Sequence, residues 1–140
     1  MNKTLYKGMF AIIIGTLGFI LYGNYLLFYP FKTLVVSEAK VVTKEIHTGD
    51  LFVYKVSYCK YTQSPAIVYR TFHKIDESRI ETFPAVQTIT VTGCNTTDIP
   101  LQTYQIMQKG EYYMLVTVVF QLNPLRQEQI VFRTDNFKII

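Results

Sequence analysis

The chain has 140 residues, with 14 basic and 10 acidic side chains and a formal net charge of +4. This length suits about one domain, and the many Tyr, Phe, Val, Ile and Thr residues favour β structure. Lys3 and Lys7 precede an apolar run, which leaves 12 basic against 10 acidic side chains in residues 32–140. Because these basic residues are scattered singly along the chain, we expect no nucleic-acid binding.

An uncharged segment of 24 residues extends from Gly8 to Phe31, between Lys7 and Lys32. As a helix it would be roughly 36 Å long, enough to cross the hydrocarbon core of a bilayer. Aromatic residues gather at its far end, as in an interfacial belt: Tyr22, Tyr25, Phe28, Tyr29 and Phe31. The sequence therefore predicts a short N-terminal tail over residues 1–7 and one transmembrane helix over residues 8–31.

A cleaved signal peptide is the main alternative, and cleavage needs small residues at the end of the apolar run. Here residues 24–30 are bulky throughout, which predicts an uncleaved signal-anchor. Lys3, Lys7 and the free amine favour a cytoplasmic N-terminus, although three lysines also follow the segment. We expect a single-pass membrane protein whose C-terminal domain is extracytoplasmic, in a periplasmic, extracellular or luminal space.

Small residues occupy one face of this predicted helix, at Gly8, Ala11, Gly15 and Gly18. Small residues on one stripe let a second helix approach closely. The alternative is that glycine is simply frequent in membrane helices. The stripe therefore predicts a possible homo-oligomer formed through the transmembrane helix, beside the lipid bilayer as the other partner.

Beyond Pro30 the hydrophobic pattern has a period of two, with turn signals about every 8 to 12 residues. Residues 51–60 give the clearest strand, with Phe52, Tyr54, Val56 and Tyr58 on one face. The polar segment 92–98 is predicted to be a loop. The expected strands, about seven if residues 34–46 form one, cover residues 34–46 (one long strand or two short ones), 51–60, 67–74, 86–91, 104–107, 112–122 and 130–139.

About seven strands in residues 32–140 predict an all-β, antiparallel sandwich. The run Gly110-x-Tyr112 resembles the tyrosine corner of immunoglobulin-like (Ig-like) domains, where the hydroxyl bonds back to the preceding corner. Residues 49–51 likewise resemble the entry to an early strand of such domains. This resemblance implies an Ig-like β-sandwich, although Met114 stands where antibody domains carry a cysteine and the chain has no Trp.

Cys59 and Cys94 are the two cysteines, and their separation and surroundings do not match a metal site. They form either a disulfide or two buried thiols, and an extracytoplasmic location favours the disulfide. With Cys59 ending a strand and Cys94 beginning a loop, the bond would attach that loop to the sheet. Asn95-Thr96-Thr97 matches a glycosylation sequon, a triplet that also occurs by chance.

The sequence contains no recognisable nucleophile, metal or phosphate motif, so we expect no enzyme activity, no cofactor and no metal. His47 and His73 are predicted to be solvated, and so are the mixed charges of residues 74–81. Asn123-Pro124 predicts a turn between two apolar strands. Leu125 and Arg126 at its tip could also contact a protein partner.

These features favour a non-enzymatic, membrane-anchored binding or scaffold module, a structural or accessory component of an envelope or virion assembly. In size and layout the chain resembles small phage or bacterial membrane-anchored accessory proteins. The alternative is a single-pass sensor or regulator whose β domain binds a ligand or partner. An envelope enzyme is the third possibility, and it would need a concave pocket with convergent polar groups.

Overall fold

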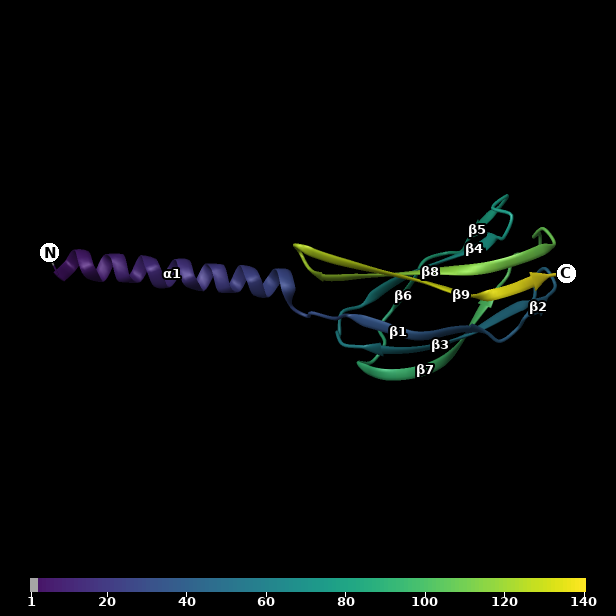
Figure 1. The fold of residues 1–140 in the computed structure, drawn as a ribbon, viewed down its shortest axis with the longest axis horizontal. Coiled ribbons are helices and arrows are strands. Elements are labelled where there is room, and N and C mark those ends of the chain that lie inside the picture. The colour runs from purple at the N-terminus through teal and green to yellow at the C-terminus, as the bar shows by residue number, and fades with distance from the viewer. Residues whose placement is uncertain (1–2) are drawn as a thin grey trace.

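The computed structural model describes residues 3–140 and shows one long helix followed by a β domain (Figure 1). The helix, α1, covers Lys3–Phe28, and its Tyr6–Phe28 segment is long and apolar enough to cross a membrane. It begins earlier and ends earlier than the predicted 8–31. Pro30 accounts for the early end, because proline disfavours a helical residue before it and cannot donate a helical hydrogen bond. The predicted tail is helical from Lys3, and residues 1–2 lie outside the described part.

A three-stranded antiparallel sheet forms one side of the β domain. Its central strand pairs with both neighbours along nearly its whole length. The order across this sheet is β1 (Leu34–Val41), β3 (Leu51–Lys60) and β7 (Gly93–Gln102).

A larger sheet, curled into a half-barrel, forms the other side (Figure 1). It is antiparallel except for the short parallel pairing of its first two strands. Its order is β2 (Glu45–Ile46), β9 (Arg126–Ile139), β8 (Gly110–Asn123), β4 (Ala66–Lys74) and β5 (Ile80–Thr82), with β6 (Val86–Thr88) also paired to β4. β1 packs beside β9, whereas β6 and β7 are edge strands on the opposite side.

The core lies between the two sheets, where the alternating strands turn their apolar faces toward each other. At its centre Phe72 makes edge-to-face contacts with Phe52 and Phe137, at ring-centroid distances of 5.0 and 4.8 Å. Phe83 adds a third such contact at 4.6 Å. Aromatic pairs in this geometry contribute beyond the area they bury.

Several strand predictions are confirmed and others are wrong. β3 covers the predicted residues 51–60, and 34–46 divides into β1 and β2. The described residues contain nine strands rather than about seven, because the charged segment before Phe83 contributes β5 and residues 93–98 of the predicted loop belong to β7. The predicted strand 104–107 is absent, since the chain there crosses between the sheets without pairing.

The hydrogen bond expected of the tyrosine corner is present. The hydroxyl of Tyr112 donates to the carbonyl oxygen of Gln108 at 2.9 Å, and the Tyr112 side chain is fully buried. Burial raises the pKa of the Tyr112 phenol. The bond ties the chain between β7 and β8 to the start of β8.

Candidate binding cleft

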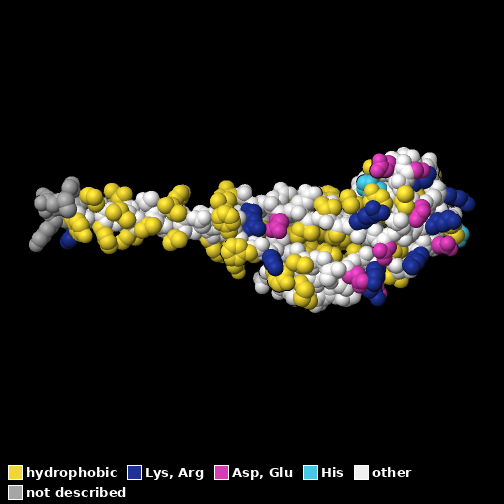
Figure 2. All heavy atoms as spheres, viewed as in Figure 1, with side chains coloured by type: hydrophobic (Ala, Val, Ile, Leu, Met, Phe, Trp, Pro, Cys, Tyr) yellow, Lys and Arg dark blue, Asp and Glu magenta, His cyan; other side chains and the backbone are white. Residues whose placement is uncertain are grey.

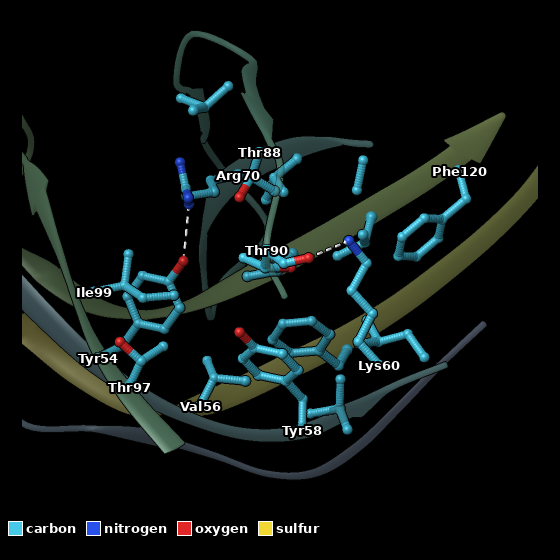
Figure 3. Close-up of a pocket in the computed structure, with 18 of the residues that line it drawn as sticks. Tyr54, Val56, Tyr58, Lys60, Arg70, Thr88, Thr90, Thr97, Ile99 and Phe120 are labelled. Carbon is cyan, nitrogen blue, oxygen red and sulfur yellow. Dashed lines mark hydrogen bonds between the residues drawn. The ribbon is translucent and has the colours of Figure 1, made fainter. Parts of the chain in front are cut away.

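A cleft of about 360 Å³ separates the two sheets in part of the β domain (Figure 3). Most of its walls are inner-face side chains of β3, β4 and β8, and β1, β6, β7, β9 and the segment after β6 complete the lining. This size lies within the range of small-molecule sites, which are mostly apolar with a few placed polar groups. The lining is of that kind: Leu34, Val36, Tyr54, Val56, Tyr58, Lys60, Ala66, Val68, Arg70, Val86, Gln87, Thr88, Thr90, Thr97, Ile99, Val116, Val118, Phe120 and Phe132.

The shape of the cleft follows from the alternation of β3. Tyr54, Val56, Tyr58 and Lys60 point to the same face of the strand and all line the cleft. The first and the last are six positions apart in extended chain, a backbone span of about 20 Å. The cleft is therefore elongated along β3, with polar groups near both ends (Figure 3).

Lys60 pairs with Leu34 at the start of β1, which places it at the end of the cleft nearer to α1, and only 2% of its surface is exposed. Its Nζ donates to the carbonyl of Thr90 at 2.9 Å and lies 5.8 Å from the ring centroid of Phe120. Among the described residues, no carboxylate forms an ion pair with it. Burial lowers the pKa of Lys60, because leaving water disfavours the charged ammonium.

At the other end of the cleft, Arg70 Nε donates to the hydroxyl of Tyr54 at 2.8 Å (Figure 3). Burial raises the pKa of the Tyr54 phenol, and the nearby guanidinium partly opposes that shift. No Asp or Glu is among the described residues that line the cleft. The cleft thus combines two cationic side chains with apolar walls and contains no acidic side chain to neutralise them.

Lys60 also lines a second, more polar pocket of about 550 Å³ beside the end of α1. Tyr29 and Pro30, which follow the helix, form part of its wall together with the loop after β3. Lys60 therefore contributes both to the apolar cleft and to the pocket where the helix meets the β domain.

The predicted turn at residues 123–124 is present and joins β8 to β9. Asn123 Nδ2 donates to the carbonyl of Leu26, and Arg126 Nη1 donates to the carbonyl of Pro30 at 2.9 Å. Arg126 also pairs with Glu128 at 3.0 Å, whereas Leu125 is 69% exposed. Within the chain, the cationic side chain of this tip contacts the helix–domain connection and the apolar one projects away.

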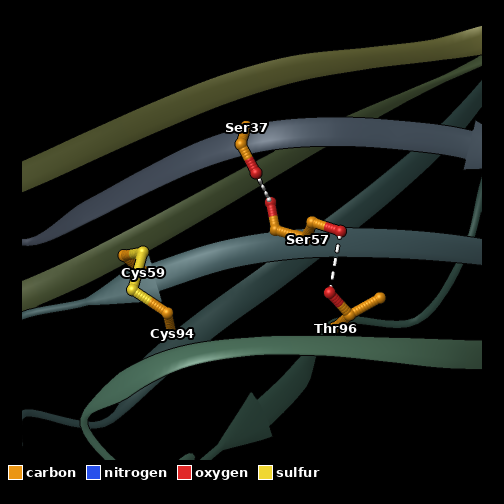
Figure 4. Close-up of a disulfide and its surroundings, with 5 residues drawn as sticks. All are labelled: Ser37, Ser57, Cys59, Cys94 and Thr96. Carbon is orange, nitrogen blue, oxygen red and sulfur yellow. Dashed lines mark hydrogen bonds between the residues drawn. A yellow bond between two sulfur atoms is a disulfide. The ribbon is translucent and has the colours of Figure 1, made fainter.

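The two cysteines form a disulfide between neighbouring strands, with their Cα atoms 3.9 Å apart (Figure 4). Cys59 and Cys94 are opposite each other in the β3–β7 pairing, two positions beyond Ser57 and Thr96, whose hydroxyls lie 2.9 Å apart. The bond therefore joins two strands of one sheet rather than attaching a loop, because residue 94 belongs to β7. Asn95 is in this exposed edge strand as well, not in the expected loop.

The small-residue stripe of α1 is exposed at Gly8, Ala11, Gly15 and Gly18. No other side chain comes within 4 Å of a Cβ built on the three glycines, so this face carries no intramolecular contact. It remains a prediction that another helix packs there.

The titratable residues singled out from the sequence lie away from the cleft. The His47 turn is closed by a backbone bond to Asp50, and His73 stacks on Tyr113 at 5.2 Å with its Nε2 bonded to Thr71. Among residues 74–81, Lys74 pairs with Asp76 at 3.2 Å and Arg79 pairs with Glu81. No group of three potential metal-binding side chains occurs in the described part of the chain.

Sequence reasoning did not identify Lys60, Arg70 or Tyr54 as a candidate site. The available signal was the position of Lys60, which continues the inward alternation of Phe52, Tyr54, Val56 and Tyr58 by one further step. A charged residue at an inward position of a strand must either find a partner or lie in a cavity.

No protein-family model and no curated protein matches this sequence. The similarities to solved structures are weak. The CARDB domain of the PF1109 protein from Pyrococcus furiosus has a TM-score of 0.42 and 12% sequence identity to this chain. The match covers 78% of this chain and 90% of that domain. A family 123 glycoside hydrolase from Clostridium perfringens has a TM-score of 0.43 and 11% sequence identity, and the match covers 78% of this chain. A Pseudomonas fluorescens alkylpurine DNA glycosylase has a TM-score of 0.40 and 9% sequence identity over 72% of this chain. This chain spans only 27% of the length of the hydrolase and 30% of the length of the glycosylase.

Proposed function

We propose that this chain is a membrane-anchored, non-enzymatic binding module in which α1 spans the bilayer and the β domain binds a ligand or partner. The observation that carries the proposal is that none of the apolar Tyr6–Phe28 segment is buried against the rest of the chain. An uncovered apolar helix is suited to hydrocarbon, because its backbone groups are satisfied within the helix itself. The Ig-like sandwich belongs to the same proposal, supported by the Tyr112–Gln108 hydrogen bond.

The distribution of side chains supports an anchor at one end of the molecule. On the face shown in Figure 2, side chains along α1 are mostly hydrophobic, whereas most charged side chains of the β domain lie on its part away from the helix. The contacts of Asn123 with Leu26 and of Arg126 with Pro30 connect the domain to the end of α1. A β domain held in this way would keep the Lys60 end of its cleft close to the bilayer surface.

The role of α1 predicts how the chain behaves when membranes are extracted. The unmodified chain should stay in the membrane pellet after alkaline carbonate treatment. A variant with Ile13→Lys and Leu17→Lys should move to the supernatant, since each central lysine costs about 2.5–3.5 kcal/mol on insertion scales. The matched control, Ile13→Leu with Leu17→Ile, should stay in the pellet. Release of the unmodified chain by carbonate would exclude a spanning helix.

The disulfide offers a measurement of orientation in intact cells. With the β domain outside the cytoplasm, a membrane-impermeant maleimide should label Cys59 and Cys94 only after an impermeant reductant has opened the bond. Labelling that needs permeabilised cells but no reductant would place a reduced domain in the cytoplasm and reverse the proposed topology. A double serine variant at the two positions controls for background labelling.

We further propose that the module is an accessory component of an envelope or virion assembly, with a protein partner beside the bilayer. The apolar helix α1 and the exposed Leu125 at the hairpin tip support this role. Detergent-solubilised chain should then co-purify with a stable partner or with itself. Monomeric behaviour with no bound partner would contradict the assembly role and leave the anchor unaffected.

A further inference from the structure

We propose that the cleft between the sheets binds a single-chain anionic amphiphile, a long-chain carboxylate, with its head group at Lys60 and its alkyl chain along β3. This inference rests on the proposed function in one respect, namely that the β domain acts by binding. It does not depend on the orientation of the chain or on the assembly role.

The anionic head group follows from the state of Lys60. A buried ammonium is costly unless it is paired and its donors are satisfied. Here three N–H donors share one protein acceptor, the Thr90 carbonyl, and the Phe120 ring contributes a cation–π contact. A carboxylate at this end of the cleft would supply the missing charge and accept a remaining donor.

The alkyl chain follows from the rest of the lining. Between Lys60 and the Arg70–Tyr54 pair the walls are formed largely by Val, Ile, Leu, Ala and Phe side chains, and no acidic residue lines the cleft. The lining follows β3 over a backbone span of about 20 Å from Tyr54 to Lys60, which suits an extended chain better than a compact polar molecule. Arg70 is only half-buried, whereas Lys60 is 2% exposed, so Lys60 is the cation that depends more on a partner inside the cleft.

The surroundings of Lys60 provide a way in from the helix end. Lys60 also lines the polar pocket that Tyr29 and Pro30 border, so a head group that enters this pocket would lie beside Lys60. On the cleft side, Ile89 and Val91 flank Thr90 and are 80% and 79% exposed. Exposed apolar side chains on both sides of a cleft-lining residue favour the approach of an alkyl chain over that of a fully polar solute.

The test uses the full-length chain in phosphatidylcholine nanodiscs and a diazirine analogue of palmitate as the photoreactive probe. After irradiation, cross-linked peptides should map to the inner faces of β3, β4 and β8. Excess oleate should compete for this labelling, whereas methyl oleate, which has no charge, should not. Labelling confined to α1 would show that the probe only partitions into lipid, and would overturn the proposal.

Lys60→Met tests the head-group contact, because it keeps an apolar stem of similar length and removes the charge. Cleft labelling should fall at least about tenfold, in line with the loss of one buried charge pair. Lys55→Met is the matched control, since Lys55 is on the same strand with an exposed side chain paired to Asp98. It should label like the unmodified chain, and Lys60→Arg should restore most of the labelling.

Thermal unfolding without the probe separates a binding role from a structural one. Removing an uncompensated buried charge should leave the melting temperature of Lys60→Met unchanged or higher, whereas a structural lysine would lower it. Val56→Phe is a second variant that fills the cleft and keeps the charge, and it should also lose labelling. Unchanged labelling in both variants, or equal competition by methyl oleate, would exclude the proposed site. Carbonate extraction of Lys60→Met reports separately on the anchor.

Discussion

Replacing Phe72 with alanine is expected to lower the free energy of unfolding of the β domain by about 3–5 kcal/mol. Phe72 is fully buried in β4, where its ring meets Phe52, Phe83 and Phe137. These partners come from β3, β9 and the segment after β5, so truncation opens a cavity where several elements meet. Because small domains are stable by only about 5–15 kcal/mol, much of the population should unfold in mild urea.

The measurement is urea unfolding of the full-length chain in detergent, followed by tyrosine fluorescence and near-ultraviolet circular dichroism. Tyr69→Ala is the matched control, because Tyr69 lies three residues earlier on β4 and is 42% exposed. It should cost about 1 kcal/mol or less. Equal losses for the two variants would show that the aromatic cluster does not form the centre of the core.

The second large effect is expected from the disulfide. Replacing Cys59 and Cys94 with serine should lower the free energy of unfolding by about 3–4 kcal/mol, as chain entropy predicts for a separation of 35 residues. The loss arises chiefly in the unfolded chain, because the β3–β7 pairing continues on one side of the bond through Ser57 and Thr96. The folded structure should therefore be preserved at low temperature.

Urea unfolding with and without a reductant checks this expectation. The unmodified chain should become as unstable under reductant as the double serine variant, which itself should not respond to reductant. Ser37→Ala, which removes a hydroxyl bonded to the Ser57 carbonyl on the neighbouring strand, serves as a control with an effect of about 1 kcal/mol. A double serine variant of undiminished stability would contradict the entropic account.

Some elements could be predicted because their patterns are local. The alternation of β3 follows from one apolar and one solvated face, and its limits of Leu51 and Lys60 agree with the structure. The absence of charge over residues 8–31 indicated the long helix. Tyr112 lay in a short motif whose hydrogen bond reaches back only four residues. In each case the physical cause of the structure is contained within a few neighbouring residues.

Other features have no local signal. β7 pairs only with β3 and exposes most of its length, so no burial imposes an alternating pattern, and Asn95 to Asp98 resembled a loop. The contact between Arg126 and Pro30 joins residues 96 positions apart. Lys60 is removed from solvent and from carboxylates only because β4, β8 and the segment at Thr90 surround it in the folded chain. The cleft is thus a property of the tertiary arrangement.

The length of the β8–β9 hairpin determines how far the β domain would extend from the proposed membrane. Both strands have 14 residues and extend from the tip beside α1 to the far end of the domain, a distance of about 46 Å (Figure 1). Since Asn123 and Arg126 hold the tip against the helix end, the charged far end would stand well clear of the lipid. A soluble protein approaching from outside would meet the charged end first, whereas a lipid-borne molecule would reach only the Lys60 end.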